Sequence, residues 1–97
     1  MTKSLHDKIA ENLARKFKTE YKSDKGIDIV TRNKAIEVET KKESLPQGIK
    51  QIAKSQKARY LAVNKQNVTN ALQETKNTGV GVMSQTGRII KKASRKK

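Results

Sequence analysis

The sequence predicts a single small α/β domain in which a mixed sheet is flanked by helices. The expected order is helix, strand, strand, strand, helix, strand, helix, strand. Three observations support it: apolar residues recur at helical spacing in three segments, short β-branched runs separate these segments, and 97 residues leave room for one core. Alternation of helical and strand patterns is typical of α/β proteins.

The first helix is predicted to begin near Leu5, because Ser4 followed by Asp7 resembles a capping box. Apolar residues at helical spacing continue from Leu5 to Phe17. Over residues 17–22 the apolar residues alternate instead with polar ones, which favours a separate strand. A helix that continues through this segment is the alternative.

Two short β-type runs follow and predict a hairpin. They cover residues 27–30 and 35–40, and the polar residues 31–34 between them are suited to a turn. In the second run Ile36 and Val38 share the face that we expect to be buried.

The remaining elements follow from the same signals. They are a helix from Leu45-Pro46 to about Lys57, a strand at 60–63, a helix from about Val68 that Gly79 stops, and a strand from Val80. Residues 88–90 are a candidate return strand. Residues 91–97 (KKASRKK) have no apolar partners, so we expect a disordered basic tail after a domain over residues 1–90.

Composition narrows the function classes. The net charge of +14, from 23 Lys and Arg against nine Asp and Glu, favours a polyanionic partner, above all nucleic acid. With no Trp and 3% aromatic residues, the chain lacks anchors for a membrane surface and a stacking platform for single-stranded bases, which favours duplex or branched DNA. The absence of Cys excludes disulfides and thiolate sites, and the absence of a long apolar segment leads us to expect a cytoplasmic protein.

The predicted hairpin carries three acidic residues, Asp28, Glu37 and Glu39. Glu37 and Glu39 point to one side of their strand, and the hairpin would bring Asp28 alongside them. Three such carboxylates repel one another unless a cation lies among them, and Mg²⁺ or Mn²⁺ suits oxygen ligands of this kind. The alternative is a strand with one solvated face whose glutamates pair with neighbouring lysines.

These residues also resemble a known family. The segments GIDIV (26–30) and AIEVETKK (35–42) resemble the active-site hairpin of the PD-(D/E)xK nuclease superfamily, and the whole order is similar to that of archaeal Holliday junction resolvases. The resemblance implies a restriction-endonuclease-like fold and a metal-dependent DNA endonuclease. It also implies that Asp28, Glu37 and the carbonyl of Val38 hold Mg²⁺ or Mn²⁺, and that Gln51 orients water or contacts a phosphate.

Two residues depart from the superfamily's pattern. Ile27 replaces the Pro that often precedes the Asp, and Glu39 stands where a catalytic Lys is expected. An acid at this position would serve as a further metal ligand or as a base for the attacking water. Lys41, on the same face if the strand continues, would then restore a positive charge.

Basic residues predict a surface that follows the phosphate backbone. Lys50, Lys54 and Lys57 would share one side of the second helix, and Lys41 and Lys42 come just after the acidic pair. The first helix adds further basic residues, namely Lys8, Arg15 and Lys16. The lone histidine, His6, is predicted to be an exposed helix residue.

Other function classes stay open. A noncatalytic nucleic-acid-binding protein would use the same charge with structural acids, and a recruiting subunit would bring a partner enzyme to DNA. By analogy with small resolvases, a homodimer is expected, because cutting two strands symmetrically requires two sites.

Overall fold

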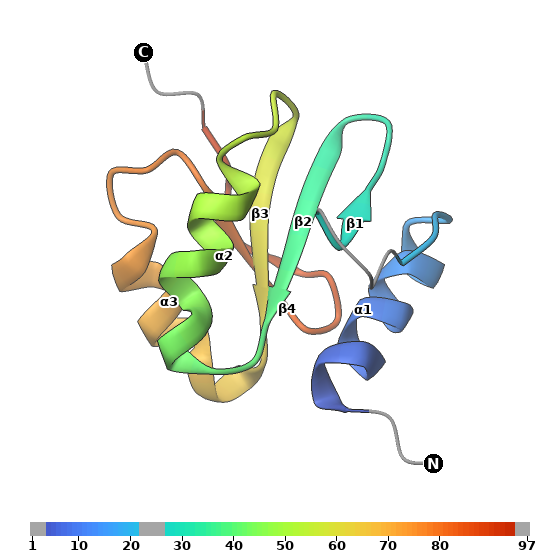
Figure 1. Cartoon of the computed structure of the whole chain (residues 1–97), viewed down its shortest axis with the longest axis horizontal. Coiled ribbons are helices and arrows are strands. Elements are labelled where there is room, and N and C mark those ends of the chain that lie inside the picture. The colour runs from blue at the N-terminus through green and yellow to red at the C-terminus, as the bar shows by residue number, and fades with distance from the viewer. Residues whose placement is uncertain (1–3, 22–26, 95–97) are drawn as a thin grey trace.

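The computed structural model describes residues 4–21 and 27–94 and has three layers, with a five-stranded mixed sheet between helices (Figure 1). The order of elements is α1 (Leu5–Lys16), β1 (Ile29–Val30), β2 (Lys34–Glu39), η1 (Lys42–Ser44), α2 (Leu45–Ile52), β3 (Ala58–Val63), η2 (Lys65–Asn67), α3 (Val68–Glu74), β4 (Gly81–Ser84) and β5 (Ile89–Lys91). The predicted α/β class is confirmed.

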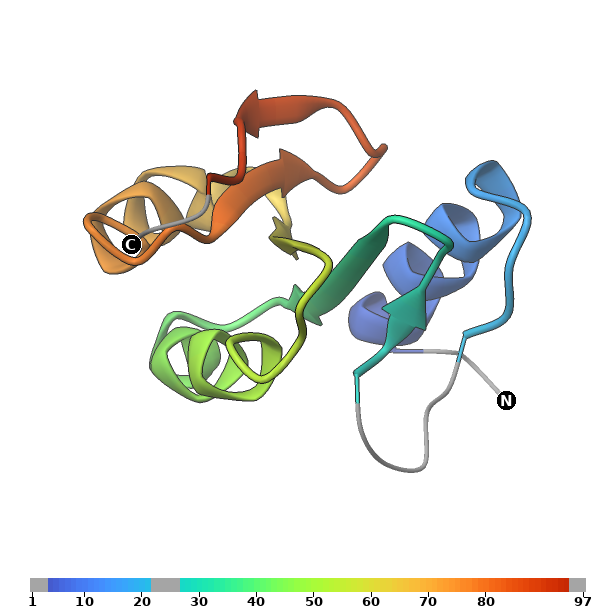
Figure 2. The ribbon, with the colours of Figure 1, turned by 90° about the horizontal axis from the view of Figure 1, so that it is seen from above.

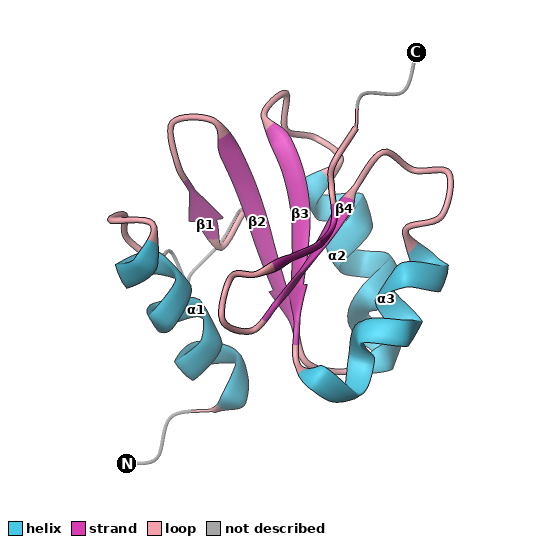
Figure 3. Cartoon of the chain, turned by 180° about the vertical axis from the view of Figure 1, so that it is seen from behind, coloured by secondary structure: helices cyan, strands magenta, loops and turns pink. Residues whose placement is uncertain are grey.

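The strands lie in the sheet in the order in which they occur along the chain, β1 to β5 (Figure 3). The central pairs β2–β3 and β3–β4 are parallel and are connected through α2 and α3. The outer pairs β1–β2 and β4–β5 are antiparallel hairpins. The predicted acid-bearing hairpin therefore exists and forms one edge of the sheet.

The helices divide between the two faces of the sheet, with α1 on one face and α2 and α3 on the other (Figure 2). Alternate residues of β2 belong to the two resulting cores. Ile36 and Val38 pack with α1, whereas Ala35 packs with Leu45 and Ile52 of α2. Glu37 and Glu39 share the face of Ala35 and so point to the α2 side, which makes this face half-buried rather than fully solvated.

The start of α1 agrees with the sequence prediction. Ser4 is the N-cap and its hydroxyl accepts a hydrogen bond from the backbone N–H of Asp7, at 3.1 Å. Residues 88–90 also form most of a return strand, because β5 pairs with β4 across the turn at Gly87.

The predicted strand at 17–22 is wrong for the residues that the structure describes. The chain turns after α1, Lys18 takes a left-handed φ of 56°, and only Tyr21 makes an isolated bridge, to Ile29. Phe17 and Tyr21 both pack against the core on the α1 side, which produced the misleading apolar alternation. Lys22 lies outside the described residues.

The second helix is shorter than predicted, because α2 ends at Ile52 instead of near Lys57. The Ser55 hydroxyl accepts a hydrogen bond from the backbone N–H of Lys57 at 3.1 Å, a local bond that competes with helix continuation. Lys54 and Lys57 therefore do not share a helix side with Lys50. The third helix also ends early, at Glu74, before the left-handed Asn77 and Gly79.

The predicted disordered tail starts at residue 91, whereas the structure includes residues 91–94 in the fold. Lys91 belongs to β5, and its Nζ donates to the Thr75 carbonyl at 2.9 Å. The backbone N–H of Ser94 donates to the Gly79 carbonyl at 2.9 Å, and Ala93 packs against the core. Residues 91–94 are therefore part of the fold, and 95–97 lie outside the described residues.

None of the helices described is long and apolar enough to cross a membrane.

Candidate active site

The β1–β2 hairpin brings Asp28 and Glu37 together. Pairing of Ile29 with Ile36 places Asp28, the preceding residue, beside Glu37. The backbone N–H of Asp28 donates to Glu37 Oε1 at 3.2 Å, and the backbone N–H of Val38 donates to Asp28 Oδ2 at 2.9 Å. Asp28 is 7% exposed, so its carboxylate is held at the start of β1 in a nearly buried position.

Glu39 extends this acidic group along β2 towards α2. The helix residue opposite it is Gly48, and a Cβ placed on Gly48 would lie 2.6 Å from Glu39 Oε2 and 2.7 Å from Glu39 Cγ. A glycine inside a helix costs about 0.5–1 kcal/mol relative to alanine. Its presence here is explained by the space that the Glu39 side chain occupies.

His6 of α1 contacts Asp28, although the sequence prediction treated it as an exposed helix residue. Its Nε2 lies 3.2 Å from Asp28 Oδ2, and its Nδ1 lies 3.1 Å from the hydroxyl of Tyr21. The same hydroxyl donates to Asp7 Oδ1 at 2.7 Å. No sequence signal identifies this contact, because it joins the first turn of α1 to the hairpin through tertiary packing alone.

The environment of the hairpin raises the pKa of all three carboxyl groups. Burial, opposed by the hydrogen bond from Val38, raises the pKa of Asp28. Burial and the nearby charge of Asp28 raise the pKa of Glu37 to about 8, and burial also raises that of Glu39. The main cause of all three shifts is burial, which disfavours the charged form of a carboxyl group.

The alternative in which each Glu pairs with a neighbouring Lys is not observed. Within residues 4–21 and 27–94, no lysine or arginine forms an ion pair with Asp28, Glu37 or Glu39. Among the described residues, His6 is thus the one basic side chain recorded in an ion pair with these acids, in a chain whose net charge is +14.

The donor set suits a hard divalent ion in part. Asp28 and Glu37 supply adjacent carboxylates, and the carbonyl of Val38 projects from the same strand edge as the N–H that contacts Asp28. Among the described residues, however, no group of three or more Asp, Glu or His side chains is arranged to hold a metal ion. An ion here would depend on water and substrate oxygens as well, as Mg²⁺ commonly does.

The other predicted site residues, apart from Lys57, lie on α2 or in the segments that flank it. Gln51 follows Gly48 by one turn on α2 and is half-buried, and its side chain makes no hydrogen bond with the described residues. Lys41 does not continue the strand, because β2 ends at Glu39, and Lys42 opens η1. Both are exposed, as are Lys50 and Lys54.

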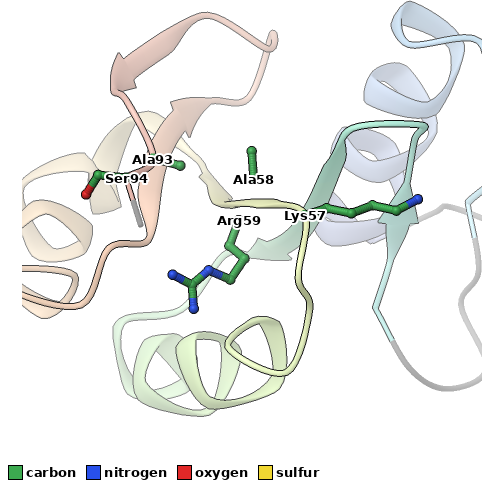
Figure 4. A pocket seen from close by; sticks show the side chains of 5 residues that line it. All are labelled: Lys57, Ala58, Arg59, Ala93 and Ser94. Atoms are coloured by element: carbon green, nitrogen blue, oxygen red, sulfur yellow. The ribbon is translucent and has the colours of Figure 1, made fainter. Parts of the chain in front are cut away.

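Lys57 is separated from the acids and is engaged elsewhere. Its Nζ donates to the Thr31 carbonyl at 2.6 Å, at the end of the hairpin remote from Glu39. A cavity of about 140 Å³ lies beside it, lined also by Ala58, Arg59, Ala93 and Ser94 (Figure 4). The Lys57 side chain extends away from this cavity in Figure 4, and no acid of the hairpin lines it.

Comparison with known proteins adds no relative. No family model, no curated protein and no solved structure matches this chain. The chemistry of the site is therefore argued from its own geometry.

The contact between Gly48 and Glu39 can be tested by a double-mutant cycle. We expect Gly48→Ala to destabilise the otherwise unchanged protein by about 1 kcal/mol, since the new methyl group must displace the Glu39 side chain. With Glu39→Ala already present, the same substitution should stabilise by about 0.5–1 kcal/mol through helix propensity. Urea unfolding of the four proteins measures both values, and equal effects in the two backgrounds would contradict the assignment.

Proposed function

We propose that this chain is a divalent-metal-dependent DNA endonuclease with a restriction-endonuclease-like fold. The observation that carries the proposal is the hairpin itself. It places Asp28 and Glu37 side by side, with Glu39 two residues further along the same strand face, and leaves all three without a lysine or arginine partner in the described chain. A buried acidic group in a strongly basic protein favours a site where a cation meets a phosphate.

Each residue has a defined role in this proposal. Asp28, Glu37 and the Val38 carbonyl hold Mg²⁺ or Mn²⁺. The bound ion supplies Lewis acidity towards the scissile phosphate and lowers the pKa of a water molecule. Glu39 accepts the proton of the attacking water, because its raised pKa makes its carboxylate a stronger base.

Hydrolysis then breaks one P–O bond of the DNA backbone. The water oxygen bonds to phosphorus, and the departing alkoxide takes up a proton. Gln51, three residues after the Gly48 that lies against Glu39, orients the water or a phosphate oxygen. The positive charge of the chain attracts duplex or branched DNA through its backbone, and a homodimer would supply two sites for paired cuts.

A cleavage assay tests the proposal directly. The substrates are a four-way junction, a linear duplex, a nicked duplex and single-stranded DNA, each incubated with Mg²⁺, with Mn²⁺ or with EDTA. We expect metal-dependent cleavage of at least one duplex or branched substrate. No cleavage of any substrate with either ion, by a protein that binds DNA, would contradict it.

One observation favours a second function. Asp28 Oδ2 already accepts a hydrogen bond from Val38 and contacts His6, so this carboxylate also serves the fold. If the acids are only structural, the chain is a noncatalytic nucleic-acid-binding protein or a subunit that recruits a partner enzyme to DNA. Calorimetry showing no site for Mg²⁺ or Mn²⁺ would favour this reading, and a stable partner in a pull-down would favour the recruiting subunit.

DNA binding should be mainly electrostatic in either case. Each phosphate neutralised by Lys or Arg contributes about −0.9 to the slope of log K against log salt concentration. With 23 Lys and Arg in the chain, we expect a clearly negative slope on duplex DNA, measured by fluorescence anisotropy between low and moderate salt. A slope near zero would show that the basic residues do not contact the phosphates.

A further inference from the structure

We propose that the cavity at the start of β3 is a phosphate-binding site, in which Arg59 and Ser94 hold the phosphate group of a nucleic-acid backbone or of a small phosphorylated compound. The site lies apart from the acidic hairpin and needs no metal ion, so the inference goes beyond the proposed function. The donors that line the cavity determine the class of ligand.

The cavity is a gap in the sheet between β3 and the segment that follows β5. β4 begins opposite Tyr60, so the first two residues of β3, Ala58 and Arg59, have a neighbouring strand on the β2 side only. Ala93 and Ser94 form the other wall of the gap (Figure 4). The volume of about 140 Å³ is far above the roughly 10–15 Å³ that one water molecule requires, so the gap has room for a larger ion.

Arg59 supplies a cation without a partner in the described chain. Its register with Ala35 places the side chain on the α2 side of the sheet, where it is half-buried. The guanidinium forms no hydrogen bond or ion pair with a described residue, whereas the ammonium groups of Lys57 and Lys91 donate to backbone carbonyls. A partly buried charge without a partner is costly, and a guanidinium offers five N–H donors in a fork that matches phosphate oxygens. The Arg59 side chain is therefore available to an anion.

The backbone adds a donor on the same side of β3. The Ala58 N–H donates to the Asn33 carbonyl at 3.1 Å, on the β2 side. Successive N–H groups of a strand point to opposite sides, so the Arg59 N–H points into the gap. It forms no hydrogen bond with a described residue, and the Gly79 carbonyl just before β4 accepts from the Ser94 N–H instead, at 2.9 Å. A backbone N–H beside an arginine is a common combination for contacting phosphate.

The other lining residues favour phosphate over a carboxylate. No acid lines the cavity, and Ser94 is exposed, with a hydroxyl that makes no hydrogen bond to a described residue. The lining therefore offers a guanidinium, a backbone N–H and a hydroxyl. A phosphate group has enough oxygens to accept from all three, whereas a carboxylate has only two oxygens.

NMR of the ¹⁵N-labelled full chain tests the site. The protein is titrated with inorganic phosphate and, separately, with sodium chloride at the same pH and ionic strength. We expect phosphate to shift the backbone N–H and Nε–H signals of Arg59 saturably at millimolar concentrations, and chloride to shift them only weakly. Signals that respond equally to the two salts would overturn the inference.

A matched pair of variants assigns the effect to the Arg59 side chain. Arg59→Gln should weaken phosphate binding, followed through the Ser94 N–H signal, by at least about tenfold. Arg88→Gln removes the same charge from an exposed position beyond the opposite end of β4 and should leave phosphate binding unchanged. Circular dichroism checks that both variants are folded. Phosphate binding that a folded Arg59→Gln variant retains in full would contradict the assignment.

A second titration, with a short DNA duplex, identifies the source of the phosphate group. If the ligand is nucleic acid, the duplex should shift the same Arg59 signals, and Arg59→Gln should make the slope of log K against log salt concentration less negative by about 0.9. If only inorganic phosphate shifts them, the phosphate site stands and its ligand is a small phosphorylated compound. Neither titration involves cleavage or a metal ion, so failure of the nuclease proposal and failure of this inference are distinguishable.

Discussion

Glu37→Gln is expected to abolish metal-dependent cleavage, with a loss of at least about 10²-fold, because even outer-shell partners of metal ligands are worth 10–100-fold. Gln keeps the shape of the side chain and can still accept the hydrogen bond from the Asp28 N–H, so the hairpin should remain folded. What is lost is the negative charge that faces the ion. DNA binding should stay equal or become slightly tighter, since an anion has left a surface that meets phosphate.

The matched control is Glu43→Gln, which removes the same charge from an exposed position in η1. It should leave cleavage unchanged. Initial rates on the best substrate and circular dichroism of both variants provide the measurement. Full activity of Glu37→Gln would show that Glu37 holds no ion and would remove the main support for the nuclease proposal.

The second large effect concerns stability and pH in the absence of metal. The pKa of Glu37 is about 8 in the folded chain against an ordinary value of 4.5. Between these values the folded chain retains a proton that the unfolded chain has lost, so stability falls as the pH rises through this window. Allowing for partial exposure of the side chain, we expect a loss of about 2 kcal/mol between pH 5 and pH 8.5. Asp28 and Glu39, whose pKa values are also raised, contribute in the same direction.

Urea unfolding in EDTA at the two pH values measures this loss. Glu37→Gln should flatten the dependence, and it should be more stable than wild-type protein at the higher pH. Adding Mn²⁺ at that pH should restore stability to the wild type only, because the ion binds the deprotonated carboxylates of the folded state. If the stability of the wild-type protein were the same at both pH values, Glu37 would be ionised in the folded chain even without a bound metal ion, and the prediction would be wrong.

Local patterns in the sequence were sufficient for most elements of the fold. Ser4 marks the start of α1, and the alternation around Ile36 and Val38 identifies β2, because caps and side-chain periodicity depend on neighbours within one element. The segment after Lys16 was misread because Phe17 and Tyr21 reach the core from a turn, where spacing in the sequence no longer reports a face.

Only part of the candidate site could be predicted, because sequence patterns report neighbours within one element and not contacts between distant elements. Asp28 and Glu37 are joined by one hairpin, whose register is a local property, so their proximity could be predicted. The contact of His6 with Asp28 depends on how α1 packs across the sheet. The isolated glycine in the second helix was an available signal, since such residues usually have a packing reason, but its partner Glu39 could be found only in three dimensions.

The bond from the Val38 N–H to Asp28 has a further consequence, for self-association. β1 has only two residues, so β2 would present backbone groups at this edge to a strand from another molecule. The Asp28 carboxylate occupies one of these groups and adds a negative charge at the point where the β1 ladder ends. A second chain that tried to extend the sheet here would have to displace the carboxylate, so the same side chain also protects the protein from edge-to-edge aggregation.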